Sequence, residues 1–178
     1  MNALAPAPAY AELCAASHFS FLRGASAPAR LVEVAVRLGH CGLGIADRNT
    51  VAGVVRAYSA LEELRRLDAD ENAGDEDDAE TRAAKSRLAA RARAFRLATG
   101  TRLVFCDDTP DILAYPADRA GWGRLCRLLT TGNRRAKKGE CHLTLADLLA
   151  DPGGLLLVLM PGPGVDLVAE RLSPALAR

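Results

Sequence analysis

The sequence is poor in the residues that usually build metal sites and nucleic-acid surfaces. It contains three histidines, and only 4% of its residues are aromatic. Its cysteines show no CxxC pair and no Cys/His spacing of the kind that binds zinc. They are Cys14, Cys41, Cys106, Cys126 and Cys141. An odd number of unpatterned cysteines without a secretory signal predicts a reduced, cytoplasmic protein.

Long apolar runs and an excess of one charge are also missing. The longest apolar run, Leu155–Met160, is far too short to cross a bilayer. The N-terminus lacks the charged and then apolar segments of a signal peptide. Lysine and arginine number 23 against 22 aspartate and glutamate, a net charge of +1. We therefore expect no membrane partner, and no global field that would attract nucleic acid.

The 178 residues are enough to bury one hydrophobic core. We expect one domain over residues 10–178, preceded by a loose, Ala/Pro-rich lead-in over residues 1–9. Residues 68–81 have almost no apolar side chains and many acids, and this composition cannot bury enough surface to order the chain. They predict a flexible acidic insertion.

Short apolar runs alternate with helical patterns along the chain. The predicted strands are Tyr10–Cys14, Leu43–Ala46, Arg102–Cys106, Asp111–Tyr115 and Leu155–Met160. The predicted helices are Pro28–Leu38, Thr50–Leu67, Arg82–Leu97, Gly121–Thr131, Thr144–Ala150 and Val165–Leu172. This alternation predicts a mainly parallel α/β architecture, with Leu155–Met160 as a strand buried on both faces.

Two motifs stand at the ends of the first two predicted strands, where α/β folds place ligands. The first is Phe19–Ser26, FSFLRGAS, and the second is Gly42–Asn49, GLGIADRN, followed by TVAGVVRA. In this order and spacing they resemble the PHP (polymerase and histidinol phosphatase) domain that begins class C bacterial DNA polymerases. The wording is most similar to the error-prone branch, and the resemblance extends over residues 10–58 and 98–160.

The resemblance implies a PHP-type distorted (β/α)7 barrel that is incomplete at its C-terminal end, because the family's last strands would follow Arg178. The polymerase carboxylates of the family would also lie elsewhere. Whether this chain is an enzyme is therefore left open, and we expect it alone not to polymerise DNA.

Active PHP domains hold several metal ions and hydrolyse phosphoesters. The resemblance places the family's His-x-His on Cys14 and Ala16, an acidic ligand on Arg23, a His ligand on Arg48 and a Glu ligand on Arg102. A guanidinium opposes a divalent cation and does not deprotonate. These five positions therefore predict a degenerate metal site, with no catalytic residue, no metal and no cofactor in this chain, although the parent polymerase would use Mg²⁺.

Two interpretations of Arg23, Arg48 and Arg102 are open. They could line the barrel mouth as an anion or DNA site. Alternatively, each pairs with a local carboxylate, Asp47 being the obvious partner, and fills the former metal cavity. We expect His18 to pack in its loop and Cys14 to be a buried structural thiol.

A basic run lies in the predicted loop Asn133–Glu140. Its cations are Arg134, Arg135, Lys137 and Lys138. Such clusters contact phosphates in nucleic-acid proteins, but most are solvated loops, and no aromatic residue is interleaved with this one.

The sequence thus predicts the metal-free, structural N-terminal PHP domain of an error-prone polymerase, of the kind used in damage-induced translesion synthesis. Its expected partners are the palm and thumb of the same polymerase, DNA through the parent protein, and mutagenesis accessory proteins. Two alternatives are a stand-alone module that binds phosphate or DNA through the arginines, and a residual metal-dependent phosphoesterase.

Overall fold

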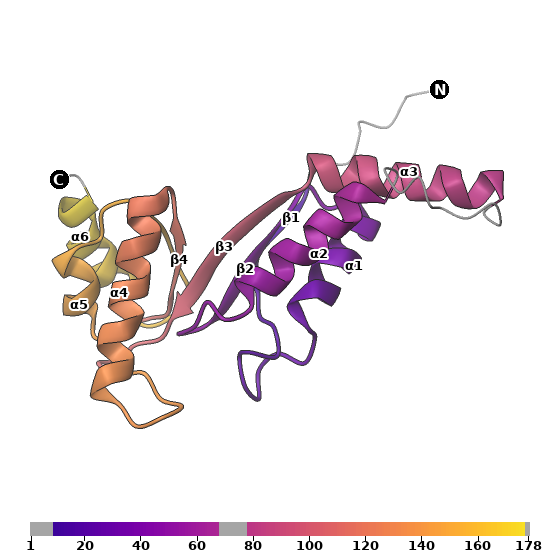
Figure 1. Cartoon of the computed structure of the whole chain (residues 1–178). Helices are drawn as coiled ribbons and strands as arrows, with labels where there is room; N and C mark the ends of the chain where they lie inside the picture. Colours follow the sequence, from indigo (N-terminus) through magenta and orange to yellow (C-terminus); the bar gives the residue numbers. More distant parts are fainter. Residues whose placement is uncertain (1–8, 68–77, 177–178) are drawn as a thin grey trace.

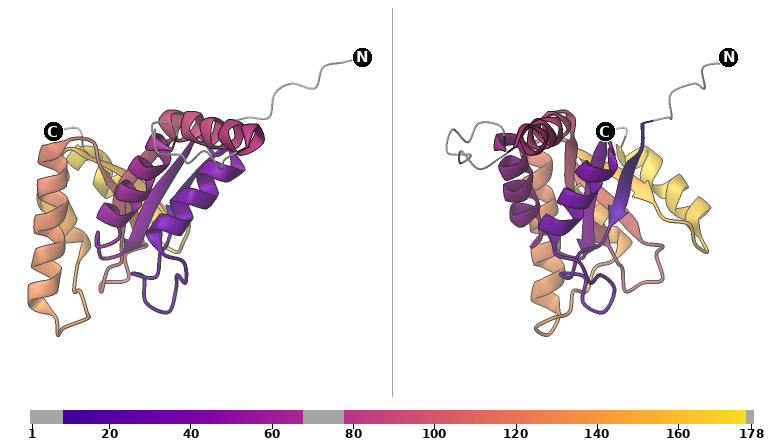
Figure 2. Two further views of the ribbon diagram at one scale, coloured as in Figure 1. Left: turned by 45° about the vertical axis from the view of Figure 1, so that its right-hand side comes forward. Right: turned by 90° about the vertical axis from the view of Figure 1, so that its right-hand side faces the viewer.

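The computed structural model describes residues 9–67 and 78–176, which form one curled sheet with helices packed on its outer face (Figures 1 and 2). The strands are β1 (Ala11–Ala15), β2 (Gly42–Arg48), β3 (Arg96–Leu103), β4 (Ile112–Pro116) and β5 (Leu155–Leu159). The predicted lead-in at 1–8 and residues 68–77 of the predicted insertion lie outside the described residues.

The strands follow one another across the sheet in chain order, β1-β2-β3-β4-β5. The prediction of a mainly parallel sheet is right for β1, β2 and β3 but wrong for β4, which is antiparallel to both β3 and β5. The connection at 104–111 is shorter than the dozen or so residues that a parallel crossover needs. The described residues therefore form a mixed half-barrel.

The helices are α1 (Pro28–Leu38), α2 (Val54–Arg66), α3 (Ala79–Ala94), α4 (Arg119–Arg135), α5 (Leu145–Ala150) and α6 (Val165–Leu176). Helices α1–α3 share a core with β2, and α4–α6 share a second core with β3, β4 and β5. No helix in the described part of the chain is long and apolar enough to cross a membrane.

The boundaries of α3 differ from those predicted at both ends. Asp78 caps the helix by accepting a hydrogen bond from the Thr81 amide at 2.7 Å, so residues 79–81 of the predicted insertion are helical. The helix ends at Ala94 rather than Leu97, and β3 begins at Arg96. Pairing of residues 96–102 with β2 overrides the helix propensity at the start of this strand.

The face of the sheet away from the helices is concave. Tyr115 on β4 donates a hydrogen bond from its hydroxyl to the Leu13 carbonyl of β1, although β2 and β3 lie between these strands. Gly44 and Gly100 make room for the ring, since a Cβ on either would lie 2.6 Å from a Tyr115 atom. The absence of these two side chains lets the sheet curl.

Strand β5 is not buried on both faces, as predicted. Leu156 and Val158 are 63% and 42% exposed, whereas Leu157 and Leu159 pack against the second core. The strand is antiparallel and pairs with β4 alone among the described strands, so only alternate side chains are covered.

Candidate functional site

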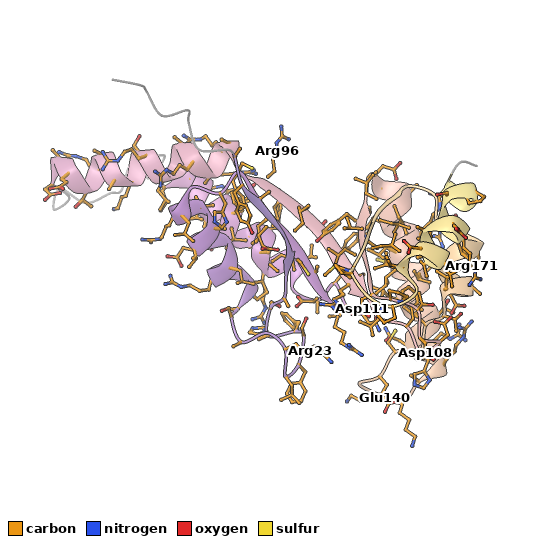
Figure 3. The ribbon with its side chains drawn as sticks, turned by 180° about the vertical axis from the view of Figure 1, so that it is seen from behind. Arg23, Arg96, Asp108, Asp111, Glu140 and Arg171 are labelled. Carbon is orange, nitrogen blue, oxygen red and sulfur yellow. The ribbon has the colours of Figure 1, made fainter. Side chains whose placement is uncertain are left out.

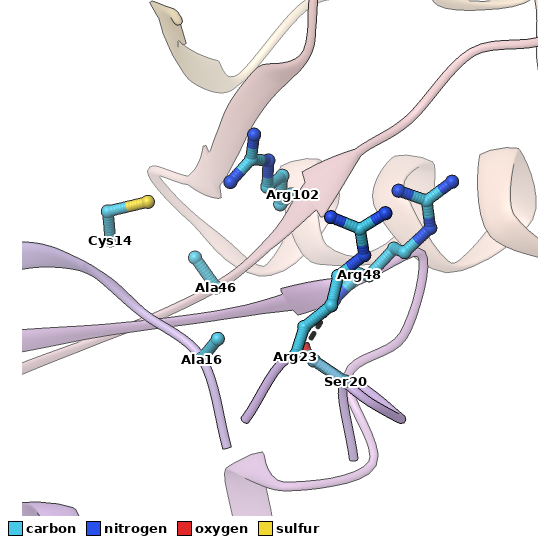
Figure 4. A pocket seen from close by; sticks show the side chains of 7 residues that line it. All are labelled: Cys14, Ala16, Ser20, Arg23, Ala46, Arg48 and Arg102. Atoms are coloured by element: carbon cyan, nitrogen blue, oxygen red, sulfur yellow. Dashed lines mark hydrogen bonds between the residues drawn. The ribbon is translucent and has the colours of Figure 1, made fainter. Parts of the chain in front are cut away.

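The residues singled out by sequence come together at one end of the sheet. Figure 3 places Arg23 and Glu140 at this end and Arg96, the first residue of β3, at the opposite end. A cavity of about 380 Å³ opens on the concave face, where the parallel strands reach their carboxyl ends. It is lined by Cys14, Ala16, Ser20, Arg23, Ala46, Arg48 and Arg102 (Figure 4). All five positions expected to match family metal ligands therefore line one cavity.

Strand alternation explains how these positions meet. Side chains two residues apart point to the same face of a strand. Ala46 and Arg48 on β2 thus share the concave face, and Arg102 on β3 pairs in register with Arg48. Arg23 does not lie on a strand but on the loop that follows β1. Cys14 also lines the cavity and is half-buried rather than buried, which corrects the prediction for its thiol.

Asp47 is fully buried and fixes the loop after β1 to the end of β2. Its carboxylate accepts hydrogen bonds from the Ser17 amide, the Ser17 hydroxyl and the Ser20 hydroxyl, each at 2.7 Å. The Ser20 hydroxyl oxygen also accepts from the Arg48 amide at 3.0 Å. The interpretation that Asp47 pairs with a cavity arginine is wrong. The carboxylate is fully buried and accepts hydrogen bonds from two serines instead. Sequence reasoning missed both serines.

The three arginines of the cavity differ in their partners. Arg102 forms an ion pair with Asp111, with 2.6 Å between Nε and Oδ2, so a local carboxylate does neutralise it. Arg23 and Arg48 are exposed, and neither has a carboxylate within ion-pair distance in the described part of the chain. Two of the three guanidiniums therefore face the cavity mouth with their charge uncompensated.

The cavity does not fit a metal centre. Three of its five candidate positions carry guanidiniums, one carries a methyl group, and Cys14 supplies the one soft donor. Across residues 9–67 and 78–176, no cluster of three or more His, Cys, Asp or Glu side chains could hold an ion. Tyr115 beside the cavity has its pKa raised by burial and by the nearby Cys14 and Glu12, so its hydroxyl keeps the proton that it donates to Leu13.

A larger groove of about 990 Å³ continues from the cavity and shares Ser20, Arg23 and Arg48 with it. Residues 19–23 line one side and residues 139–142 line the other, at the end where both loops descend in Figure 1. Phe21 and Leu22 are 82% and 90% exposed. Both residues belong to the motif FSFLRGAS, but the sequence does not predict that their side chains are exposed.

The basic run is divided between a helix and a loop. Arg134 and Arg135 belong to the last turn of α4, which corrects the predicted loop from Asn133. The Arg135 guanidinium binds the Asp147 carboxylate at 2.7 Å, whereas Lys137 and Lys138 are exposed beyond the helix. His18 is exposed and contacts the Phe19 ring edge-on at 4.6 Å, consistent with packing in its loop.

No protein-family model matches the chain. It is 52% identical over 154 residues to an error-prone DNA polymerase of Rhodopseudomonas palustris (strain BisB5), which covers 86% of this chain and 12% of the relative. The chain is a homologue of one segment of the error-prone DNA polymerases. Error-prone DNA polymerase 1 of Rhizobium meliloti (strain 1021) is 45% identical over 155 residues, which are 87% of this chain and 11% of that polymerase.

The error-prone DNA polymerase of Bradyrhizobium diazoefficiens is 44% identical over 174 residues, covering 92% of this chain and 13% of its own length. This chain thus spans 11–13% of the length of these relatives. Among solved structures, a candidate metal-dependent phosphoesterase from Bifidobacterium adolescentis matches with a TM-score of 0.41 and 24% identity. That match covers 72% of this chain and 36% of the other.

Proposed function

We propose that the chain is a metal-free, structural PHP-type module at the N-terminus of an error-prone DNA polymerase. Identity of 44–52% to error-prone polymerases over most of the chain supports the family. The observation that carries the metal-free role is the convergence of Cys14, Ala16, Arg23, Arg48 and Arg102 on one cavity.

The chemistry of these residues opposes phosphoester hydrolysis. A metal-dependent phosphoesterase needs cations that acidify a bound water and neutralise the phosphate. Arg23, Arg48 and Arg102 each place a positively charged guanidinium at a ligand position, and this charge repels a divalent ion instead of binding it. Asp111, which forms an ion pair with Arg102, is not among the residues that line the cavity.

The partners follow from the same family assignment. The module packs on the palm and thumb of its polymerase and meets DNA and mutagenesis accessory proteins through the larger protein. The polymerase reaction, in damage-induced translesion synthesis in the cytoplasm, uses Mg²⁺ held by carboxylates outside this segment.

Two measurements test the proposal. The first is phosphoesterase turnover of the purified chain with added Mn²⁺, for which we expect none; turnover that depends on Mn²⁺ would favour the residual phosphoesterase. The second mixes the chain with the R. palustris polymerase from which the matching segment has been removed. We expect a stable complex on size exclusion, and two separate peaks would count against the structural role.

A second candidate function is anion or DNA binding at the cavity mouth. Its specific support is that Arg23 and Arg48 lack carboxylate partners in the described part of the chain, whereas Arg102 and Arg135 have them. This function is compatible with the structural one, since neither requires a metal.

A further inference from the structure

The loop between β1 and α1 is held rigidly at its base. The Ser17 carbonyl accepts from the Ser20 amide at 2.9 Å, and the Ser20 carbonyl accepts from the amides of Arg23 and Gly24 at 2.9 and 3.0 Å. The buried Asp47 binds both serines from below. Gly24 is required here, because a Cβ would lie 2.2 Å from the Ser17 oxygen. The loop therefore has one preferred shape.

This shape presents two large apolar side chains to solvent. Phe21 and Leu22 have lost almost none of their accessible surface, and Leu22 has a φ of 60°, in the left-handed region that is unfavourable for leucine. Such conformations persist where the surrounding structure enforces them, and they cluster at binding sites. A preorganised loop that exposes a phenyl ring is suited to contact a flat, partly apolar ligand.

The groove beside this ring carries excess positive charge. Arg23 and Arg48 line it without carboxylate partners in the described residues. Lys137 and Lys138 immediately precede Gly139 and Glu140, which line the opposite side. The acid in this wall, Glu140, lies 3.4 Å from His142. The groove thus combines an exposed aromatic ring with two arginines in its lining and two exposed lysines next to its opposite wall.

We infer that this groove binds single-stranded DNA, with phosphates on Arg23 and Arg48 and one base stacked on Phe21. Aromatic platforms in a basic groove recognise single strands because every unpaired base offers a π face, which a duplex hides within its stack. The choice of DNA among polyanions rests on the proposed polymerase function. The two walls could not be paired from the sequence, since Phe21 lies far along the chain from residues 139–142 on the other side of the groove.

The test is fluorescence anisotropy of the chain with a labelled oligothymidine of about 12 nucleotides and with the matching duplex, over a range of salt concentrations. We expect tighter binding of the single strand. Arg23→Ala and Arg48→Ala should each reduce the slope of log affinity against log salt by about 0.7, the value for one lost phosphate contact. Phe21→Leu keeps an apolar side chain but removes the π face, and should weaken binding about fivefold or more.

The matched control is Arg96→Ala, because Arg96 is exposed and starts the same strand that Arg102 nearly ends, at the far end of the sheet (Figure 3). It should leave both affinity and salt slope unchanged. Circular dichroism should show unaltered folding for all four variants, since each changes an exposed side chain.

Several results would overturn the inference. One is equal binding of duplex and single strand; another is an equal loss with Arg96→Ala. If inorganic phosphate bound but the oligonucleotide did not, the groove would be an anion site and not a DNA site. Affinity retained by Phe21→Leu but lost by Phe21→Ala would indicate an apolar contact with the strand instead of base stacking. None of these outcomes bears on metal content or turnover, so failure here is distinct from failure of the proposed function.

Discussion

The parallel and antiparallel halves of the sheet each use one aspartate to fix a loop, but with different partners. In the parallel half, Asp47 is fully buried and takes hydrogen bonds from two neutral serines. In the antiparallel half, Asp147 binds the Arg135 guanidinium at 2.7 Å together with the Thr144 amide and hydroxyl, both at 2.9 Å. Asp47 therefore leaves Arg23 and Arg48 without a carboxylate partner in the described part of the chain, whereas Asp147 neutralises Arg135. The carboxylate's neighbours thus decide which cations remain available to a ligand.

The largest expected effect is that of Asp47→Ala. It leaves three donors in the Ser17–Ser20 loop without an acceptor, and each unsatisfied buried donor costs about 1–3 kcal/mol. We expect the free energy of unfolding in urea to fall by about 3 kcal/mol or more. Asp47→Asn keeps one acceptor oxygen and should cost less.

Asp166→Ala is the control for this change, because Asp166 is an exposed aspartate in the first turn of α6. It should alter stability by less than about 1 kcal/mol. A loss for Asp47→Ala no greater than for Asp166→Ala would contradict the anchoring role of Asp47.

The next effect concerns Gly100 on β3, the strand shared by the two halves. In Gly100→Ala, the new Cβ would lie 2.4 Å from the Ala114 carbonyl oxygen and 2.6 Å from the Tyr115 ring. Because backbone on the paired strand must move, we expect a loss of about 1–3 kcal/mol in unfolding free energy.

Gly123→Ala is the matched control, since the nearest atom to its Cβ is the flexible Arg127 Nη1 at 3.4 Å. In helix α4 it should be neutral or stabilise by up to about 1 kcal/mol. Equal stability of Gly100→Ala and the parent protein would show that the sheet does not need the glycine to curl.

The smallest effect is that of Asp147→Asn, and it depends on pH. The Arg135 guanidinium, with help from Thr144, lowers the pKa of Asp147 below its ordinary 3.8, although partial burial acts in the opposite direction. A lowered pKa in the folded state means stability that is fully present above the unfolded value and is lost as the pH falls through the folded value. The parent protein should therefore be more stable than the variant by at most about 1 kcal/mol at neutral pH, because the half-exposed Arg135 leaves the ion pair screened by solvent. This gap should close below pH 3.8.

Unfolding titrations from neutral pH to about pH 2 measure this gap. Asp166→Asn serves as the control, because its carboxylate is exposed and has no ion pair in the described part of the chain. A gap that stays constant or widens in acid would contradict the ion-pair account.

The sequence predicts which residues at the strand ends line the cavity, but it does not predict their hydrogen-bond partners. Residues 46, 48 and 102 could be placed because strand alternation and register are regular, and the family motifs supplied the order of the elements. The partner of Asp47 could not be predicted, since it depends on how the Ser17–Ser20 loop folds back. The start of β3 was missed for a similar reason: long-range pairing with β2, not local propensity, fixes Arg96 as a strand residue.

The exposure of Phe21 was equally inaccessible to sequence reasoning. The apolar residues around it favour burial, whereas in the folded loop, whose base is held by backbone hydrogen bonds, the Phe21 side chain is exposed. For the basic run, the sequence does not predict which of its cations has a carboxylate partner. Its four cations look equivalent in sequence, but the end of α4 brings Arg135 to Asp147 and leaves the lysines in solvent.

The central claim is that the five cavity positions are former metal-ligand positions that no longer bind an ion. The direct measurement is elemental analysis of the chain, purified without chelator or metal-binding tag, beside a variant that carries the family's ligands. That variant combines Cys14→His, Ala16→His, Arg23→Asp, Arg48→His and Arg102→Glu. We predict no stoichiometric metal in the parent protein and bound Zn²⁺ or Mn²⁺ in the variant. One or more equivalents of metal in the parent protein would contradict the account.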